Sequence, residues 1–199
     1  MRIRKKDLEI ALAKVPVFRD PKAALEQYPT PASIAADMLF NAYSNGDVEG
    51  MKVMDLGCGT GVLSLGAWML GAGMVVGYDV DPDALETARE CARSFGSDAV
   101  FIESDVNGVA EKADTVVMNP PFGCQTRRAD RDFLDKAMDS ADCIYSVHKA
   151  ETLEFVTERA EDRGRRVVYN KIYKYEIPHT FSFHKSVKRT VDVVVVNIR

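Results

Sequence analysis

Short apolar segments alternate with amphipathic segments along the chain from Met51 onward, which is the pattern of repeated strand–helix units. The expected strands are 51–55, 74–79, 99–103, 114–118 and 142–147, the expected helices are 62–70, 82–94, 130–139 and 150–163, and two longer strands follow at 166–175 and 190–198. Repeated strand–helix units build a parallel sheet with helices on both faces, and a final hairpin adds one antiparallel strand. We therefore predict an α/β, doubly wound, seven-stranded mixed sheet.

The segment before Met51 is predicted to be a short helical extension. Residues 3–14 have the spacing of a helix, a proline-rich loop follows, and a second helix is expected from Pro31 to Asn45-Gly46, with Thr30 capping its free amides. The chain has 199 residues, of which 46% are hydrophobic and 28% charged, and this suits one globular domain. We expect a single domain over 1–199, divided into an extension over 1–48 and a catalytic core over 49–199.

The cysteines and the hydropathy pattern bear on the compartment. None of the four cysteines belongs to a CxxC pair, and the three histidines are not at ligand spacing beside them, so we expect no metal site. The sequence has neither the apolar core of a signal peptide nor a run of membrane-spanning length. These features predict a cytoplasmic protein with reduced thiols.

Charge is distributed unevenly along the chain. Residues 1–162 carry a net charge of −11, whereas residues 163–199 carry +7. Within the basic part, residues 177–190 contain no acid and mix cations with aromatic rings, a combination that suits phosphates and unstacked bases. We predict an RNA-binding hairpin there, with the contacts made by Phe181, Phe183, His184, Lys185, Lys188 and Arg189. A solvated hairpin whose phenylalanines face the core is the alternative.

A glycine-rich turn follows the first strand, and a ligand could approach its backbone closely. The turn reads Gly57-Cys58-Gly59-Thr60-Gly61, and Val62 stands where a nicotinamide-binding loop would require glycine. Asp79 ends the second strand at roughly the distance in sequence at which an acid accepts hydrogen bonds from ribose hydroxyls. Asp81, in contrast, precedes Pro82 and is predicted to cap a helix.

The sequence Asn119-Pro120-Pro121-Phe122 follows the fourth strand and is the most specific feature of the chain. Prolines donate no backbone hydrogen bond, so the Asn119 side chain and the Pro120 carbonyl can face a ligand as acceptors. A conjugated amine is a poor nucleophile that becomes tetrahedral and positive when it attacks a methyl group. Two acceptors would align this amine and stabilise the charge, while Phe122 would stack on a planar substrate.

Taken together, these motifs resemble known methyltransferases. An acid followed by the glycine turn resembles the cofactor loop of S-adenosylmethionine-dependent class I methyltransferases, and Asn-Pro-Pro-Phe resembles the motif of enzymes that methylate adenine, guanine or glutamine amines. With Leu25-Glu26-Gln27-Tyr28-Pro29-Thr30 and Phe183-His184-Lys185, the chain resembles, over nearly its whole length, the methyltransferase-like protein 5 family of ribosomal-RNA adenine N6-methyltransferases.

The resemblance implies a Rossmann-like class I fold, S-adenosylmethionine as cofactor, and methylation of an adenine in ribosomal RNA, with the small subunit expected. Asn119, Pro120, Pro121 and Phe122 would be catalytic, and the cofactor would be held by Gln27, Tyr28, Thr30, Asp55, Gly57, Cys58, Gly59, Gly61, Asp79, Asp105 and Val106. The extension over 1–48 would form a lid, in which Gln27 and Thr30 close over the cofactor. Gly57 and Gly59 would flank the methionine part of the cofactor, Asp79 would hold its ribose, and Asp105 with Val106 its adenine. The alternatives are glutamine N5 methylation of a protein and a noncatalytic RNA-binding scaffold.

The resemblance also implies a partner, a small zinc-finger activator of methyltransferases. In the strand order expected for this fold, Ala99–Ile102 lies at a sheet edge, where unpaired backbone groups could accept another strand. Proline at Val100 would disturb that pairing if the Val100 amide faced outward.

Overall fold

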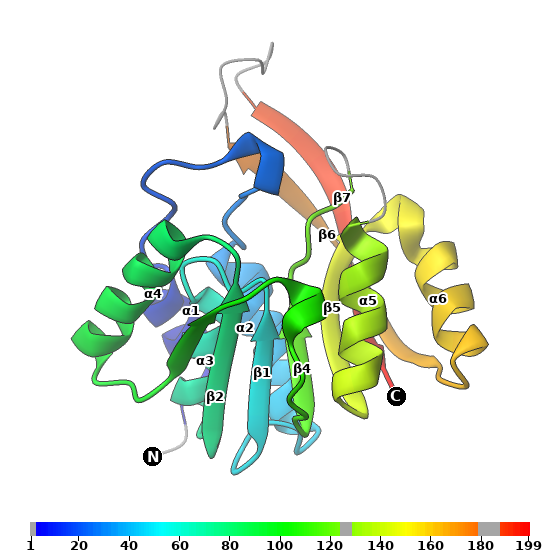
Figure 1. The fold of residues 1–199 in the computed structure, drawn as a ribbon, viewed down its shortest axis with the longest axis horizontal. Helices are drawn as coiled ribbons and strands as arrows, with labels where there is room; N and C mark the ends of the chain where they lie inside the picture. The colour runs from blue at the N-terminus through cyan, green and yellow to red at the C-terminus, as the bar shows by residue number, and fades with distance from the viewer. Residues whose placement is uncertain (1–2, 124–128, 179–187) are drawn as a thin grey trace.

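The computed structural model describes residues 3–123, 129–178 and 188–199, and it contains the predicted seven-stranded sheet (Figure 1). The strands are β1 Lys52–Leu56, β2 Met74–Asp79, β3 Val100–Glu103, β4 Thr115–Met118, β5 Cys143–Lys149, β6 Val167–Pro178 and β7 Lys188–Ile198. Their order across the sheet is β3-β2-β1-β4-β5-β7-β6. β1 to β5 pair in parallel, whereas β7 runs against both of its neighbours, β5 and β6. The mixed sheet and its antiparallel strand are therefore confirmed.

Helices cover both faces of this sheet (Figure 1). They are α1 Lys5–Leu12, α2 Ala32–Ser44, α3 Val62–Met69, α4 Pro82–Phe95, α5 Ala129–Ser140 and α6 Leu153–Asp162, and the short 3₁₀ helices are η1 Ala23–Leu25, η2 Val106–Gly108 and η3 Ala150–Thr152. The helix predicted over 150–163 is thus η3 followed by α6. The last two strands extend further toward each other than their predicted bounds.

Side chains of β1 point alternately to the two faces of the sheet, and each face has its own hydrophobic cluster. Val53 packs in a cluster with side chains of α1, α2 and α3, whereas Met54 and Leu56 pack with side chains of α5 and α6. α4 packs on the same face as α3, and its residues Leu85 and Ala88 cluster with the side chain of Phe101 in β3. Because successive strand residues point to opposite faces, a five-residue strand anchors helices on both sides.

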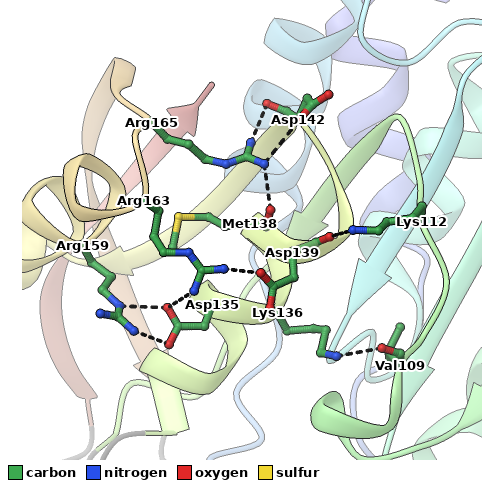
Figure 2. A network of polar contacts seen from close by, with 10 residues as sticks. All are labelled: Val109, Lys112, Asp135, Lys136, Met138, Asp139, Asp142, Arg159, Arg163 and Arg165. Atoms are coloured by element: carbon green, nitrogen blue, oxygen red, sulfur yellow. Dashed lines mark hydrogen bonds and ion pairs between the residues drawn. The ribbon is translucent and has the colours of Figure 1, made fainter.

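The acid–base contacts between α5 and α6 form a connected network (Figure 2). Arg159 holds the Asp135 carboxylate with two nitrogens, at 2.8 and 2.6 Å, and Arg163 bridges Asp135 to Asp139. Arg165 extends the network by donating to the Met138 carbonyl at 2.7 Å. A bidentate arginine–carboxylate pair has a fixed geometry, so the network sets how α6 lies against α5.

The structure corrects one predicted helix start. The N-cap of α2 is Pro31 and not Thr30, and this N-cap has no side-chain capping hydrogen bond. The Thr30 hydroxyl instead accepts a hydrogen bond from Asn119, far away in the sequence. The prediction for Asp81 is confirmed, because its carboxylate accepts from the Asp83 amide at 3.1 Å at the start of α4.

β3 lies at a sheet edge as predicted, but the Val100 amide does not face outward. The Ser104 amide donates to the Asp79 carbonyl of β2 at 2.9 Å. Backbone amides alternate in direction along a strand, so those of Ile102 and Val100 also point toward β2. The amides of Phe101 and Glu103 therefore face the open side of the edge.

In the part of the chain that the structure describes, no helix has both the length and the apolar character needed to cross a membrane.

Candidate functional site

A cleft of about 630 Å³ lies at the carboxyl ends of the parallel strands. Residues 13–31, which we call the strap, connect α1 to α2 and cross this edge of the sheet (Figure 1). The strap supplies many of the side chains that line the cleft. The predicted site residues that line it are Gln27, Tyr28, Thr30, Asp55, Gly57, Cys58, Gly59, Asp79, Asp105, Val106, Asn119 and Pro121. Gly61, Pro120 and Phe122 lie outside the lining. The cleft has the size of an ordinary small-molecule site.

The glycine turn after β1 is shaped by left-handed backbone conformations. Gly57 has φ 70° and Gly59 φ 52°, in the region where side chains are strained. A Cβ on Gly57 would lie 2.9 Å from the Phe133 ring, and one on Gly59 would lie 2.8 Å from the Phe18 ring. The Gly57 and Cys58 amides donate to the Tyr78 carbonyl at 2.8 and 2.9 Å, which fixes the turn to β2. The turn thus presents bare backbone to the cleft between two aromatic rings.

Two carboxylates lie behind this turn. Asp55 is fully buried, and its Oδ2 accepts from the Ser64 amide at 2.9 Å and from the Ser64 hydroxyl at 2.6 Å. Burial, together with the nearby charge of Asp79, raises the pKa of Asp55 to about 7. Its Oδ1 has no hydrogen-bond partner among the described residues. A buried acceptor without a partner at a cleft wall can receive a hydrogen bond from a ligand.

Asp79 is held by backbone amides on both oxygens. Its Oδ2 accepts from Gly59 at 2.8 Å and its Oδ1 accepts from Asp81 at 2.9 Å. Burial raises the pKa of Asp79 above its ordinary value. Each carboxylate oxygen keeps acceptor capacity beyond one such bond, so Asp79 can still accept from the hydroxyls of a sugar.

Asp105 borders the cleft after β3. Its Oδ1 accepts from the Asn107 amide at 2.9 Å and caps the short helix η2, while Val106 is buried beside it. Asp105 therefore caps a turn and lines the cleft at the same time.

The strap is fastened to the start of α4. Gln27 is buried, and its Nε2 donates to Asp81 Oδ2 at 2.6 Å while its Oε1 accepts from the Lys22 amide at 2.7 Å. The Lys22 ammonium contacts Asp81 at 2.6 Å and Asp83 at 2.9 Å. These contacts hold this part of the strap at the end of the cleft formed by the glycine turn and the start of α4.

The other end of the strap is fastened to the Asn-Pro-Pro-Phe turn. Asn119 Nδ2 donates to the Thr30 hydroxyl at 2.9 Å. Asn119 Oδ1 is buried and has no hydrogen-bond partner among the described residues. The amide therefore turns its occupied donor toward the strap and keeps an open acceptor.

Three residues that the sequence analysis did not single out help to shape this site. Glu26 has the left-handed φ of 50°, and its Oε2 accepts from the Phe122 amide at 2.8 Å. Phe18 and Phe133 are the rings against the glycine turn. Glu26 belongs to the quoted Leu25–Thr30 motif, but its contact depends on how the strap folds back, for which a single sequence gives no signal.

Phe122 is not brought into the cleft lining. Its side chain is partly buried and packs against the hydrophobic cluster formed by side chains of α1, α2 and α3. His148, in β5, is also buried, and its ring shares a 2.8 Å hydrogen bond with the Ser146 hydroxyl. Burial lowers the pKa of His148 to about 4.

Most of the predicted RNA-binding residues lie outside the described residues, namely Phe181, Phe183, His184 and Lys185. Lys188 and Arg189 belong to the first part of β7, where they pair with Pro178 and Ile177 of β6. The neighbouring part of β6 reaches the cleft, because Tyr175 lines it and donates its hydroxyl to the Pro29 carbonyl at 2.8 Å.

The geometry suits a nucleoside-bearing cofactor next to an amine. The exposed glycine backbone and the fixed Asp79 carboxylate lie at one end of the cleft, and the open oxygen of Asn119 lies at the end formed by β4. Doubly wound sheets bind nucleosides in this way, at the carboxyl ends of strands where the order of the strands reverses. Here that reversal falls between β1 and β4.

Comparisons with known proteins agree with this geometry. A family model described as Ribosomal protein L11 methyltransferase (PrmA) matches residues 35–120. The rRNA N(6)-adenosine-methyltransferase METTL5 of Danio rerio is 39% identical over 202 residues, covering 98% of this chain and 97% of that relative. The rRNA N(6)-adenosine-methyltransferase Mettl5 of Drosophila melanogaster is 36% identical, covering 96% and 94%.

Solved structures share the fold. The crystal structure of a Pyrococcus horikoshii protein, described as a candidate RNA methyltransferase, has a TM-score of 0.93 at 42% identity and covers 100% of this chain and 98% of that chain. The magnesium protoporphyrin IX methyltransferase of Synechocystis PCC 6803, with bound SAM, has a TM-score of 0.67 at 17% identity, covering 83% and 78%. At that identity the likeness concerns the fold alone.

Proposed function

This chain belongs to the METTL5 family of rRNA N(6)-adenosine-methyltransferases, and from that membership we propose that it methylates the N6 amine of an adenine in small-subunit ribosomal RNA. It is an S-adenosylmethionine-dependent methyltransferase, and its substrate class is ribosomal RNA. The choice of the small subunit is our proposal, because the relatives' names specify ribosomal RNA and no subunit.

The observation that carries the proposal is the open acceptor of Asn119. The oxygen Oδ1 is buried at the cleft without a partner among the described residues, whereas Nδ2 is occupied by Thr30. An unpaired buried acceptor is costly, and a substrate N–H would remove that cost. The site therefore favours a group that carries hydrogens, such as the N6 amine of adenine, over a carbonyl oxygen.

The residues around the glycine turn are proposed to hold the cofactor. Asp79 would accept from its ribose hydroxyls, Gly57 and Gly59 would allow its methionine part to approach the backbone, and Asp105 with Val106 would contact its adenine. Asp55, Gln27, Tyr28 and Cys58 would complete the wall. When bound, S-adenosylmethionine supplies a methyl group on a positively charged sulfur, which is a strong electrophile.

The Asn-Pro-Pro-Phe turn is proposed to act on the amine. As the new nitrogen–carbon bond forms and the sulfur–carbon bond breaks, positive charge develops on the nitrogen, which then releases a proton to water. Asn119 Oδ1 would hold one amine hydrogen, aligning the nitrogen and stabilising this charge. A second bond, to the Pro120 carbonyl, remains a prediction, because Pro120 lies outside the cleft lining. The target base would have to leave its helix to reach the cleft. Stacking of Phe122 on that base remains a prediction.

The basic hairpin is proposed to bind the RNA around the target. Lys185, Lys188 and Arg189 would contact phosphates, and Phe181, Phe183 and His184 would contact unstacked bases. The position of the hairpin supports this proposal. The described part of β6, which leads into the hairpin, reaches the cleft through Tyr175.

A small zinc-finger activator protein is proposed to dock on the β3 edge. Val100 is 50% exposed there, and the outward amides are those of Phe101 and Glu103. The Arg89 side chain of α4 already donates to the Phe101 carbonyl at 2.9 Å. Another strand would therefore pair mainly with the remaining outward groups of this edge.

We also propose that the protein works in the cytoplasm. The three described cysteines, Cys58, Cys91 and Cys143, are free and buried, which suits a reducing compartment.

Transfer of labelled methyl from S-adenosylmethionine tests the proposed function. The substrates are small-subunit rRNA, large-subunit rRNA, assembled ribosomal subunits and a protein fraction that contains translation factors, with Asn119→Ala as the matched inactive control. We expect label in N6-methyladenosine of the small-subunit RNA. Label in glutamine would favour protein methylation, and RNA binding without cofactor binding or transfer would favour the scaffold.

A further inference from the structure

We propose that Thr30 is a positioning residue for Asn119: its hydroxyl occupies the amide nitrogen, so that the amide oxygen stays directed at the substrate amine. This inference rests on the proposed function of Asn119. It gives Thr30 a part in the transfer step, in place of the lid over the cofactor that the resemblance implies.

The first step of the argument is the pairing of the amide. Asn119 Nδ2 lies 2.9 Å from Thr30 Oγ1, and Oδ1 has no partner among the described residues. The two ends of an amide have nearly the same shape but opposite hydrogen-bonding roles. If Oδ1 faces the amine, Nδ2 must find an acceptor elsewhere or stay unsatisfied. Thr30 is that acceptor.

The second step is that Thr30 itself is held firmly. It stands between Pro29 and Pro31, whose rings fix the backbone on either side. The Pro29 carbonyl accepts from the Tyr175 hydroxyl at 2.8 Å, and the Pro31 carbonyl accepts from the Ala35 amide at 2.9 Å in the first turn of α2. A hydroxyl on such a support can set the direction of its partner.

The third step is that the strap contacts the catalytic turn a second time. Glu26 Oε2 accepts from the Phe122 amide at 2.8 Å, so hydrogen bonds from the strap reach both Asn119 and Phe122. The strap contacts the cofactor end separately, through Gln27 and Asp81. The Thr30 contact can therefore be removed while the contacts at the cofactor end remain.

The test compares Thr30→Val, Thr30→Ala and Thr30→Ser with the wild type. Valine keeps the shape of threonine and removes the acceptor, whereas serine keeps the hydroxyl. Thr157→Val is the remote control, because it removes a hydroxyl that donates to the Leu153 carbonyl in α6. For each protein we would measure kcat at saturating S-adenosylmethionine on ribosomal RNA, the Kd of the cofactor by calorimetry, and the thermal unfolding midpoint.

We expect kcat to fall about 10- to 100-fold in Thr30→Val and Thr30→Ala, because a misaligned catalytic group costs rate in this range. We expect Thr30→Ser to recover most of the turnover, and the cofactor Kd to stay within about twofold of the wild-type value in all of these folded variants. If Thr30→Val unfolds, Thr30→Ala carries the same comparison.

Two results would overturn the inference. Wild-type kcat in a folded variant without the hydroxyl would mean that Asn119 does not need Thr30. A loss of rate that more cofactor restores, accompanied by a weaker cofactor Kd, would assign Thr30 to the lid. If instead the wild-type protein itself transferred no methyl to ribosomal RNA adenines, the proposed function would fail, which is a distinct outcome.

Discussion

The amide nitrogen of Gly59 lies 2.8 Å from Asp79 Oδ2, so the glycine turn after β1 and the acid that ends β2 hold each other in place. The second oxygen of Asp79 is held by the Asp81 amide. The carboxylate is therefore oriented by the chain's own backbone, and a ligand that binds it meets an acceptor that is already fixed.

The first prediction is that Asp79→Asn weakens cofactor binding at least tenfold and lowers the unfolding midpoint. An asparagine amide offers one acceptor, and its NH₂ group would face a backbone N–H, leaving one amide without its bond. Calorimetric titration with S-adenosylhomocysteine measures the affinity. Asp98→Asn is the control, because Asp98 is exposed in the turn between α4 and β3 and does not line the cleft. Equal affinities in the two variants would contradict the assignment of Asp79.

The second prediction is that Asn119→Ala abolishes methyl transfer and leaves cofactor affinity nearly unchanged. Asn119 has its open oxygen at the end of the cleft formed by β4, where we propose that the amine binds, and not at the glycine turn. Loss of an oriented polar group in such a site costs about 100-fold or more in rate. Single-turnover transfer to ribosomal RNA gives the rate, and near-normal turnover in the folded variant would refute the catalytic role.

The third prediction concerns pH. Burial raises the pKa of Asp55 from its ordinary 3.8 to about 7, so the folded protein binds this proton more readily than the unfolded chain does. The contribution of Asp55 to stability is therefore fully present below pH 3.8 and is lost as the pH rises to 7.

Asp55→Asn removes this titration and can keep an acceptor for Ser64. The free energy of unfolding of this variant and of the wild type would be measured by denaturant at several pH values. The difference, variant minus wild type, should become more positive between pH 4 and 7 and stay constant above pH 7. A constant difference between the two proteins across that window would mean that Asp55 is not buried in its neutral form.

The fourth prediction is that replacing Lys185, Lys188 and Arg189 by alanine weakens RNA binding without altering cofactor affinity. Each phosphate contact that is removed should reduce the log–log salt slope of binding by roughly 0.7 to 0.9. RNA titrations at several salt concentrations measure this slope. If it does not change, the RNA binds elsewhere.

The fifth prediction separates the two kinds of amide on β3. Val100→Pro removes a donor that faces β2 and should cost about 1–3 kcal/mol of stability, whereas Glu103→Pro removes an outward donor and should cost less. Denaturant unfolding measures both. With the activator, Glu103→Pro should lose binding while staying folded. Hydrogen exchange of the wild type should then show new protection at the Phe101 and Glu103 amides, and protection of another surface instead would place the partner elsewhere.

The order and type of the main elements could be predicted from the sequence because each has a clear period and clear boundaries. The parallel sheet follows from strand–helix alternation and its antiparallel strand from the final hairpin, while the edge position of β3 follows from the strand order expected for this fold. Motif residues such as Asp55, Asp79 and Asn119 meet at one cleft because each follows or ends a parallel strand. Local sequence carries this kind of information.

Contacts of the strap could not be predicted because they depend on how a proline-rich segment folds back. Thr30 has the sequence context of a helix cap, but its hydroxyl pairs with Asn119, and a cap and a long-range partner use the same chemistry. The left-handed Glu26 gives no signal of its own, because non-glycine residues in that region are set by tertiary contacts. The direction of the Val100 amide depends on register, which composition does not fix.

The position of β7 between β5 and β6 also determines the order in which the nascent chain can be assembled. β6 is synthesised first, but it has no hydrogen-bonding partner in the sheet except β7. Until β7 has left the ribosome, β5 is an open edge and β6 is an unattached segment, both available for wrong pairings. Insertion of β7 covers the β5 edge and attaches β6 in a single step. A truncation or substitution that removes β7 therefore also removes β6 from the sheet.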